Sequence, residues 1–136
     1  MLSAEELPKV LDSRAEELKR GLENFYGSEV LYRIPLVPFT FTEGVQYFVE
    51  NAEAFWLLTD ICVLFSSKLE LEQQDDTFFD IVLLVKNGGA VLTFGDGNGN
   101  ILYSHTYTYT DCPEGEYQFF LEGPRGDRVL LLPSEH

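Results

Sequence analysis

The run of residues from Ala54 to Phe65 is the feature that most constrains how this chain can fold. Ten of its twelve residues are apolar, and the two exceptions are Thr59 and Asp60. At helical spacing the run forms three stripes, and a helix that is apolar almost all round is buried on most sides. The run is shorter than the roughly 20 apolar residues needed to span a bilayer. We therefore expect a helix at the centre of a folded domain, with Trp56 in the core.

Asp60 is the unusual residue of this helix, because a carboxylate among apolar side chains needs a hydrogen-bond partner or a raised pKa. One interpretation is a catalytic or ligand-binding acid. The other is a structural carboxylate that accepts hydrogen bonds from the backbone, a tyrosine or an arginine. No second carboxylate, histidine or metal-type cluster lies at helical spacing from Asp60, and this favours the structural interpretation. Asp60 is kept as a candidate binding residue.

The acidic composition restricts the class of partner. The chain has 136 residues, of which 9 are basic and 23 acidic, giving a net charge of −14. Direct nucleic-acid binding is disfavoured, because phosphate contacts need clustered Lys and Arg. We favour acidity as a means of solubility, and the alternatives are a basic protein partner or mimicry of a nucleic-acid backbone. A mimic would use the segment richest in acidic residues, which contains Glu70, Glu72, Asp75, Asp76 and Asp80.

Length and cysteine content indicate a single cytoplasmic domain over residues 1–136. A chain of this length is one domain of ordinary size. Its first ten residues have neither the basic start nor the apolar run of a signal peptide. No segment is long enough to cross a membrane, so no membrane contact is expected. The two cysteines, Cys62 and Cys112, are interpreted as reduced thiols, which are usual in a cytoplasmic protein.

Three helices are predicted in the first half of the chain. The first is amphipathic and runs from Ala4 or Pro8 to Asn24. Thr42 caps a second helix over Glu43–Asn51. The apolar run forms the third helix, directly after a tight corner.

Between the first and second helices, Ser28–Phe41 is expected to be an extended connection with a short strand at Val30–Arg33. Pro35 and Pro38 exclude this segment from a central strand position.

After the third helix the periodicity changes, and this change predicts strands. The five main strands, separated by turns, are Phe78–Lys86, Ala90–Phe94, Ile101–Thr110, Tyr117–Leu121 and Arg128–Leu132. The predicted fold is α+β: three N-terminal helices packed on a five-stranded antiparallel meander sheet.

The third of these strands has one aromatic face and one hydroxyl-bearing face. Tyr103, His105, Tyr107 and Tyr109 alternate with serine and threonine. One interpretation is an aromatic binding surface with a titratable imidazole. The other, which we favour, is that the aromatic face covers the central helix while the threonines face water. These four residues are kept as candidate binding residues in addition to Asp60.

No catalytic site is predicted. His105 with Cys112 or Ser104 could form a nucleophile and base, but no nucleophile elbow, phosphate-binding loop or metal-ligand spacing supports them. We expect no catalytic residue, no metal and no cofactor. The predicted function is a non-catalytic, cytoplasmic protein-interaction module with an unidentified protein partner, and a homodimer is compatible with the sequence. The alternatives are the acidic decoy and a small hydrolase or ligand-binding enzyme that uses Asp60 or His105.

Several motifs resemble those of a family of small bacterial proteins that carry an uncharacterised domain. The matching segments are Gly27–Glu29 with Tyr32 and Arg33, Phe41–Phe48, Ala54–Asp60, Tyr109–Pro113 and Leu131–Glu135. The resemblance runs from about Leu22 to the end and leaves the N-terminal helix outside. It implies a protein of cyanobacteria or other bacteria, often associated with plasmids or phage. It implies no activity.

We predict that the segment Asp96–Asn100 does not bind calcium. It places oxygen ligands at its first, third and fifth positions, as an EF-hand loop does, but Ile101 stands where that loop needs glycine. Glycine and asparagine are also the residues that tight turns between strands demand. Calorimetry with calcium checks the prediction. A saturable one-site isotherm with a Kd below about 1 mM, the weak end of known calcium modules, would contradict it.

Overall fold

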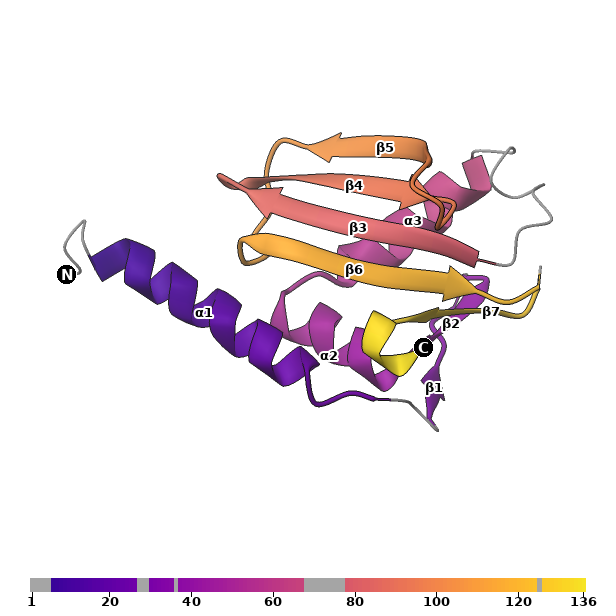
Figure 1. The fold of residues 1–136 in the computed structure, drawn as a ribbon, viewed down its shortest axis with the longest axis horizontal. Helices are drawn as coiled ribbons and strands as arrows, with labels where there is room; N and C mark the ends of the chain where they lie inside the picture. Colours follow the sequence, from indigo (N-terminus) through magenta and orange to yellow (C-terminus); the bar gives the residue numbers. More distant parts are fainter. Residues whose placement is uncertain (1–5, 27–29, 36, 68–77, 125) are drawn as a thin grey trace.

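The computed structural model packs helices against one face of a single mixed sheet (Figure 1). It describes residues 6–26, 30–35, 37–67, 78–124 and 126–136. The helices are α1 (Glu6–Leu22), α2 (Glu43–Asn51) and α3 (Phe55–Ser67), together with a short 3-10 helix, η1 (Pro133–Glu135). The strands are β1 (Leu31–Tyr32), β2 (Phe39–Thr42), β3 (Phe78–Lys86), β4 (Gly89–Gly95), β5 (Ile101–Tyr107), β6 (Gly115–Glu122) and β7 (Arg128–Leu131).

The predicted helices are present, with small differences at their ends. Helix α2 has the predicted bounds, and the hydroxyl oxygen of Thr42 caps it by accepting a hydrogen bond from the Val45 amide at 3.4 Å. Helix α3 begins at Phe55 and continues to Ser67, and α1 ends at Leu22. The prediction that all helices precede the sheet is wrong, because β1 and β2 lie between α1 and α2 in the chain.

The sheet differs from the predicted five-stranded antiparallel meander in strand number, direction and order. Its order is β1-β2-β7-β6-β3-β4-β5, and β2 runs parallel to β7. Strands β6-β3-β4-β5 form a Greek key, in which the chain returns after β5 to lie beside β3. This order gives β3 a partner on both edges. The physical reason for this central position of β3 is burial. Its inner face is fully apolar and consists of Phe79, Ile81, Leu83 and Val85.

Strand β2 has a neighbouring strand on each side, contrary to the prediction made from the prolines. Pro35 and Pro38 were expected to keep this segment out of the sheet interior, yet Phe39–Thr42 pairs with β1 on one side and β7 on the other. Pro38 lies immediately before the strand, so no amide is missing from the ladder inside it. Both phenylalanines of β2 are buried and carry the strand into the core. The predicted short strand within Val30–Arg33 is present as the two-residue β1.

Helix α3 is buried on one side and open on the other. Leu57, Leu58 and Ile61 are fully buried in the same core cluster as the inner face of the sheet. Val63 is 56% exposed, and Trp56 is half-buried. The expectation that α3 is buried almost all round, with Trp56 in the core, is therefore wrong, because the sheet covers only one side of the helix. In the described part of the chain, no helix combines the length and apolar character that crossing a membrane requires.

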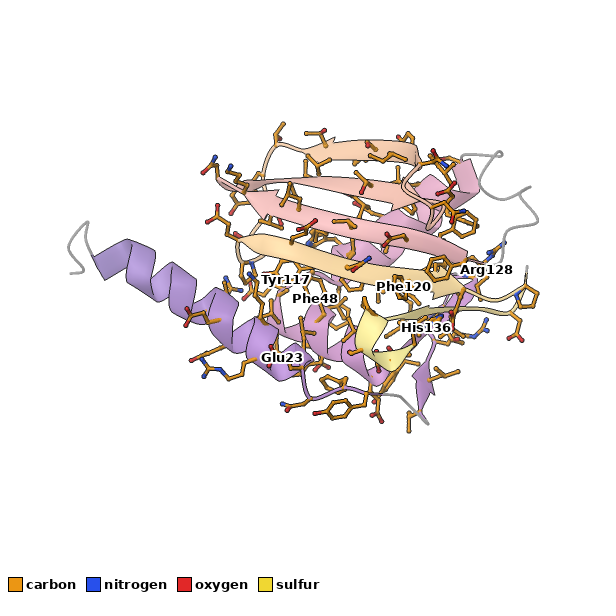
Figure 2. All side chains as sticks on the ribbon, in the orientation of Figure 1. Glu23, Phe48, Tyr117, Phe120, Arg128 and His136 are labelled. Atoms are coloured by element: carbon orange, nitrogen blue, oxygen red, sulfur yellow. The ribbon has the colours of Figure 1, made fainter. Side chains whose placement is uncertain are left out.

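Aromatic side chains take part in two contacts between the helices and the sheet (Figure 2). The ring of Phe48 on α2 lies 4.9 Å from the ring of Tyr117 on β6, measured between centroids. Arg128 on β7 is buried, and its guanidinium carbon lies 5.1 Å from the ring centroid of Phe65 and 5.2 Å from that of Phe79. A cation is thus held between a ring of α3 and a ring of β3.

We predict that Leu58→Ala lowers the free energy of unfolding by about 2–5 kcal/mol, because it leaves a cavity where the leucine side chain is fully buried. Val63→Ala is the matched control on the exposed side of the same helix, and it should change that free energy by less than about 0.5 kcal/mol. Urea unfolding followed by circular dichroism measures both. Equal losses for the two variants would show that the buried side of α3 is assigned wrongly.

Candidate functional site

Strand β5 presents its aromatic residues to the helix layer. In register with β4, the residues Tyr103, His105 and Tyr107 lie opposite buried β4 residues, so they are on the inner face of the sheet. Ser104 and Thr106, which alternate with them, are exposed on the outer face. This is the arrangement predicted for a strand whose aromatic side covers the central helix.

Asp60 has a tyrosine partner. The Tyr107 hydroxyl donates a hydrogen bond to Oδ2 of Asp60 at 2.8 Å. Trp56 precedes Asp60 by one helical turn and lies on the same side of α3, and its ring centroid is 4.9 Å from that of Tyr107, with the planes tilted by 58°. Burial raises the pKa of Tyr107, and the hydrogen bond to Asp60 and the negative charge of that carboxylate raise it further. Tyr107 therefore remains a neutral donor at physiological pH.

A pocket of about 320 Å³ opens beside this pair of residues. The residues that line it are Glu53, Trp56, Asp60, Tyr107, Tyr109, Thr110 and Asp111. Three are acidic and three are aromatic, and the described lining contains no lysine, arginine or histidine. The Tyr109 hydroxyl donates to the Asp111 carboxylate, and this hydrogen bond raises the pKa of Tyr109. We call this the acidic aromatic pocket.

Three of the five predicted candidates therefore meet in one place: Asp60, Tyr107 and Tyr109. His105 is next to the pocket, with its ring edge-on to Tyr107 at 4.7 Å between centroids, and it is not among the described lining residues. Tyr103 lies further along the strand against Phe94, at 6.3 Å between ring centroids.

The candidates predicted from the sequence leave out four lining residues: Glu53, Trp56, Thr110 and Asp111. Trp56 could have been found from its four-residue spacing to Asp60, but it was assigned to the core. Glu53 lies in the corner between α2 and α3 with a φ of 53°, and only the geometry of that corner brings it to the pocket. Asp111 follows β5 in the connection to β6, whose path depends on the strand order.

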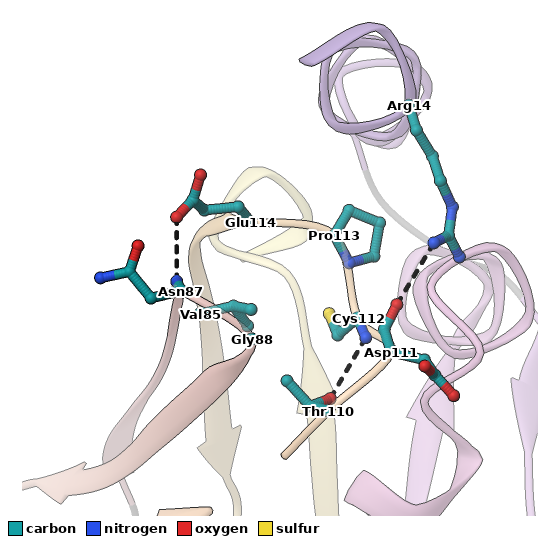
Figure 3. Close-up of a pocket in the computed structure, with 9 residues that line it drawn as sticks. All are labelled: Arg14, Val85, Asn87, Gly88, Thr110, Asp111, Cys112, Pro113 and Glu114. Atoms are coloured by element: carbon teal, nitrogen blue, oxygen red, sulfur yellow. Dashed lines mark hydrogen bonds between the residues drawn. The ribbon is translucent and has the colours of Figure 1, made fainter. Parts of the chain in front are cut away.

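A second pocket, of about 490 Å³, lies between α1, the β3–β4 hairpin and the β5–β6 connection (Figure 3). Arg14 donates from Nη1 to the backbone oxygen of Asp111 at 3.2 Å, and the Asn87 amide donates to the Glu114 carboxylate at 3.1 Å. Cys112 lines this pocket but is buried. Burial raises the pKa of its thiol to about 12, although the positive charge of Arg14 acts in the opposite direction.

The Asp96–Asn100 segment is the connection between β4 and β5, as predicted. Oδ1 of Asp96 accepts from the Asn98 amide at 2.8 Å and the Asn100 amide at 3.2 Å, and Oδ2 accepts from Asn100 Nδ2 at 2.8 Å. These hydrogen bonds, that from the Asn100 side chain first, lower the pKa of Asp96. Both carboxylate oxygens are thus used to close the turn.

Of the acidic residues proposed for a nucleic-acid mimic, only Asp80 can be placed. It lies on the outer face of β3, where Oδ1 accepts a hydrogen bond from Gln118 Nε2 at 2.8 Å. Glu70, Glu72, Asp75 and Asp76 lie outside the described residues.

Comparison with known proteins gives a family and a similar fold. A crystal structure of a protein of unknown function from Enterococcus faecalis is similar, with a TM-score of 0.54, 17% identity, and coverage of 72% of this chain and 89% of that chain. A comparison with curated proteins gave no match. The model of the family of unknown function DUF6876 matches residues 16–136, and this match begins before Leu22 and so includes part of α1. The chain therefore belongs to the DUF6876 family of unknown function.

Proposed function

We propose that this protein is a non-catalytic protein-interaction module of the bacterial cytoplasm, and that the acidic aromatic pocket is its contact site for a basic protein partner. The observation that carries the proposal is the lining of this pocket, in which three carboxylates and three aromatic rings lie together. Tryptophan and tyrosine are the residues that most often dominate binding energy at protein interfaces. Carboxylates around them add charge complementarity to a basic surface.

Beyond the solubility that the acidic composition provides, the net charge of −14 is complementary to a basic partner. A strongly acidic surface attracts basic proteins over several ångströms and raises their rate of encounter. Screening limits this attraction to about 8 Å at physiological ionic strength, so the specific contact has to come from a shaped site. The acidic aromatic pocket supplies such a site, while the general acidity supplies the attraction.

The chemistry of the described residues favours binding over catalysis. Tyr107 and Asp60 are hydrogen-bonded to each other, and the pKa of Tyr107 is raised, which makes this tyrosine a poor base or nucleophile near neutral pH. His105 packs against the Tyr107 ring, whereas Cys112 is buried beside the second pocket. The two residues considered as a base and a nucleophile thus belong to different environments.

We expect the partner to depend on the pocket. Tagged protein is used to capture partners from host extract, and mass spectrometry quantifies what is retained. Trp56→Leu and Asp60→Asn should each reduce recovery of the specific partner by at least about tenfold, the size expected for a dominant interface residue. Phe55→Leu is the matched control, because Phe55 is a neighbouring α3 residue that is 49% exposed and not among the described pocket residues.

Circular dichroism of each variant confirms that it is folded. Equal recovery by the wild type and both pocket variants would refute the pocket as the contact site. The decoy alternative has its own variant, in which five acidic residues are neutralised together: Glu70, Glu72, Asp75, Asp76 and Asp80. Loss of binding in that variant alone would favour the decoy and contradict the proposal.

The absence of a catalytic cysteine can be tested separately. In a Cys62→Ala protein, we predict that iodoacetamide at pH 8 modifies Cys112 only after unfolding, because Cys112 is buried and its pKa is about 12. At pH 8 such a thiol is ionised in only about one molecule in ten thousand, and the thiolate is the reactive form. Mass spectrometry of folded and urea-unfolded samples measures the difference. Fast modification of the folded protein would restore Cys112 as a candidate nucleophile.

A further inference from the structure

The two inner rings of the acidic aromatic pocket form a corner. Trp56 and Tyr107 have their centroids 4.9 Å apart and their planes tilted by 58°. A cation within about 6 Å of a ring centroid is attracted by the ring face. Two tilted faces can both contact one cation, as the rings of Phe65 and Phe79, tilted by 80°, contact the guanidinium of Arg128. The corner therefore suits a cation, and the preference for an ammonium comes from Asp60: Tyr107 already donates to its Oδ2, and the remaining oxygen suits the single-point contact of an ammonium better than the two-point fork of a guanidinium.

The carboxylates of the pocket are spread around it. Glu53 comes from the corner before α3, Asp60 from α3 and Asp111 from the connection after β5. Among the described residues, no three acidic, histidine or cysteine side chains come close enough together to hold a metal ion. Charge that is distributed in this way suits a monovalent organic cation better than a metal ion, which needs converging oxygen ligands.

Asp60 retains capacity for a ligand. Its described hydrogen bond, from Tyr107, uses Oδ2, which leaves Oδ1 available to an N–H donor. One basic side chain contacts the rim, since Arg14 donates to the backbone oxygen of Asp111, but Arg14 lines the neighbouring pocket instead. The described lining of the acidic aromatic pocket thus has negative charge and ring faces without a cation of its own.

The same fold already holds a cation in a comparable place. At the other end of α3, Arg128 lies 5.1 Å from the ring of Phe65 and 5.2 Å from the ring of Phe79, and it is only 7% exposed. That site also combines a ring from α3 with a ring from the sheet. There the chain supplies the cation, whereas the acidic aromatic pocket is open to one from outside.

We propose that the acidic aromatic pocket binds an alkylammonium group, and that its source is a lysine side chain of the basic partner. The inference deepens the proposed function and rests on it for the source of the lysine. The volume of about 320 Å³ is at the small end of ligand pockets, which suits a single side chain. Trp56 and Tyr107 contact the methylene groups and the charge, and Asp60 accepts from the ammonium.

Trp56 is the single tryptophan of the chain, so its fluorescence reports on this pocket alone. The probes are Nα-acetyl-lysine methylamide, Nα-acetyl-arginine methylamide, choline, and 3,3-dimethylbutan-1-ol, which is the uncharged isostere of choline. We expect the lysine probe and choline to change the fluorescence saturably. The arginine probe should bind more weakly than the lysine probe, and the uncharged isostere at least about tenfold more weakly than choline. Equal binding of choline and its isostere would overturn cation recognition.

Variants test the two parts of the site, with affinity measured by ¹⁵N NMR titration so that loss of the tryptophan is no obstacle. Trp56→Leu should weaken binding of the lysine probe by about 2- to 30-fold, the range of cation–π contributions. Asp60→Asn should also weaken binding of the lysine probe. The matched control is Asp80→Asn, which removes one negative charge on the outer face of the sheet and should weaken binding less. Unchanged binding in both pocket variants would overturn the site.

The outcomes separate this inference from the proposed function. A captured partner that depends on Trp56 and Asp60, together with no response to the lysine probe, would overturn lysine recognition and leave the interaction module intact. Saturable binding of choline without binding of the lysine probe would also overturn the lysine source, and would indicate a free small cation as the ligand. Binding of the lysine probe with no captured partner would support the site and contradict its role in the interaction.

Discussion

The packing of α3 against the inner face of the sheet is the constraint on which the rest of the structure depends. Leu57, Leu58 and Ile61 are fully buried there, and complete burial of each such side chain is worth about 1.5–3 kcal/mol. Against a typical net stability of about 5–15 kcal/mol, no arrangement that exposes this side of α3 could compete. The sheet therefore has to extend over the helix, and β4 and β5 provide that extension beyond β3. The acidic aromatic pocket lies where the far strand of this extension meets the start of α3, so the core determines where the pocket forms.

Local patterns predicted the local structure well. The bounds of α2 and its cap follow from a threonine before an amphipathic segment, and β3 follows from a run of β-branched and aromatic residues. The structural interpretation of Asp60 named a tyrosine among its possible partners, and Tyr107 is that partner. This part could be predicted because an apolar helix leaves its single carboxylate few ways to be satisfied, and β5 was expected to turn its aromatic face to the helix. The predicted burial of Trp56 is wrong for a related reason: an apolar helix was expected to be covered on all sides, and the sheet covers only one side of α3.

Strand order and the full lining of the pocket could not be read from the sequence, since both depend on contacts between distant residues. Periodicity shows that a segment is a strand but not which strand lies beside it. The parallel pairing of β2 with β7 joins residues near position 40 to residues near position 130. The sequence did not predict it, because Pro38 was expected to exclude a central strand in this segment. The return of β6 to β3 follows from the need to cover both edges of the most apolar strand. Asp111 reaches the pocket only because that return carries the chain past the start of α3, and no local feature of the β5–β6 connection indicates this path.

The imbalance of charge gives the pocket its chemical character. With 23 acidic and 9 basic residues, the chain has too few cations to neutralise its own carboxylates in pairs. Arg128 is buried against two rings, where contacts between a cation and aromatic faces are strongest. In the pocket near the start of α3, Asp60 and Asp111 each accept a hydrogen bond from a tyrosine, and the described lining holds no lysine, arginine or histidine. Under the proposal, an external cation that enters this pocket gains attraction to three carboxylates and two ring faces. The two ends of one helix thus show a filled and an open form of the same arrangement, and the proposal assigns recognition to the open form.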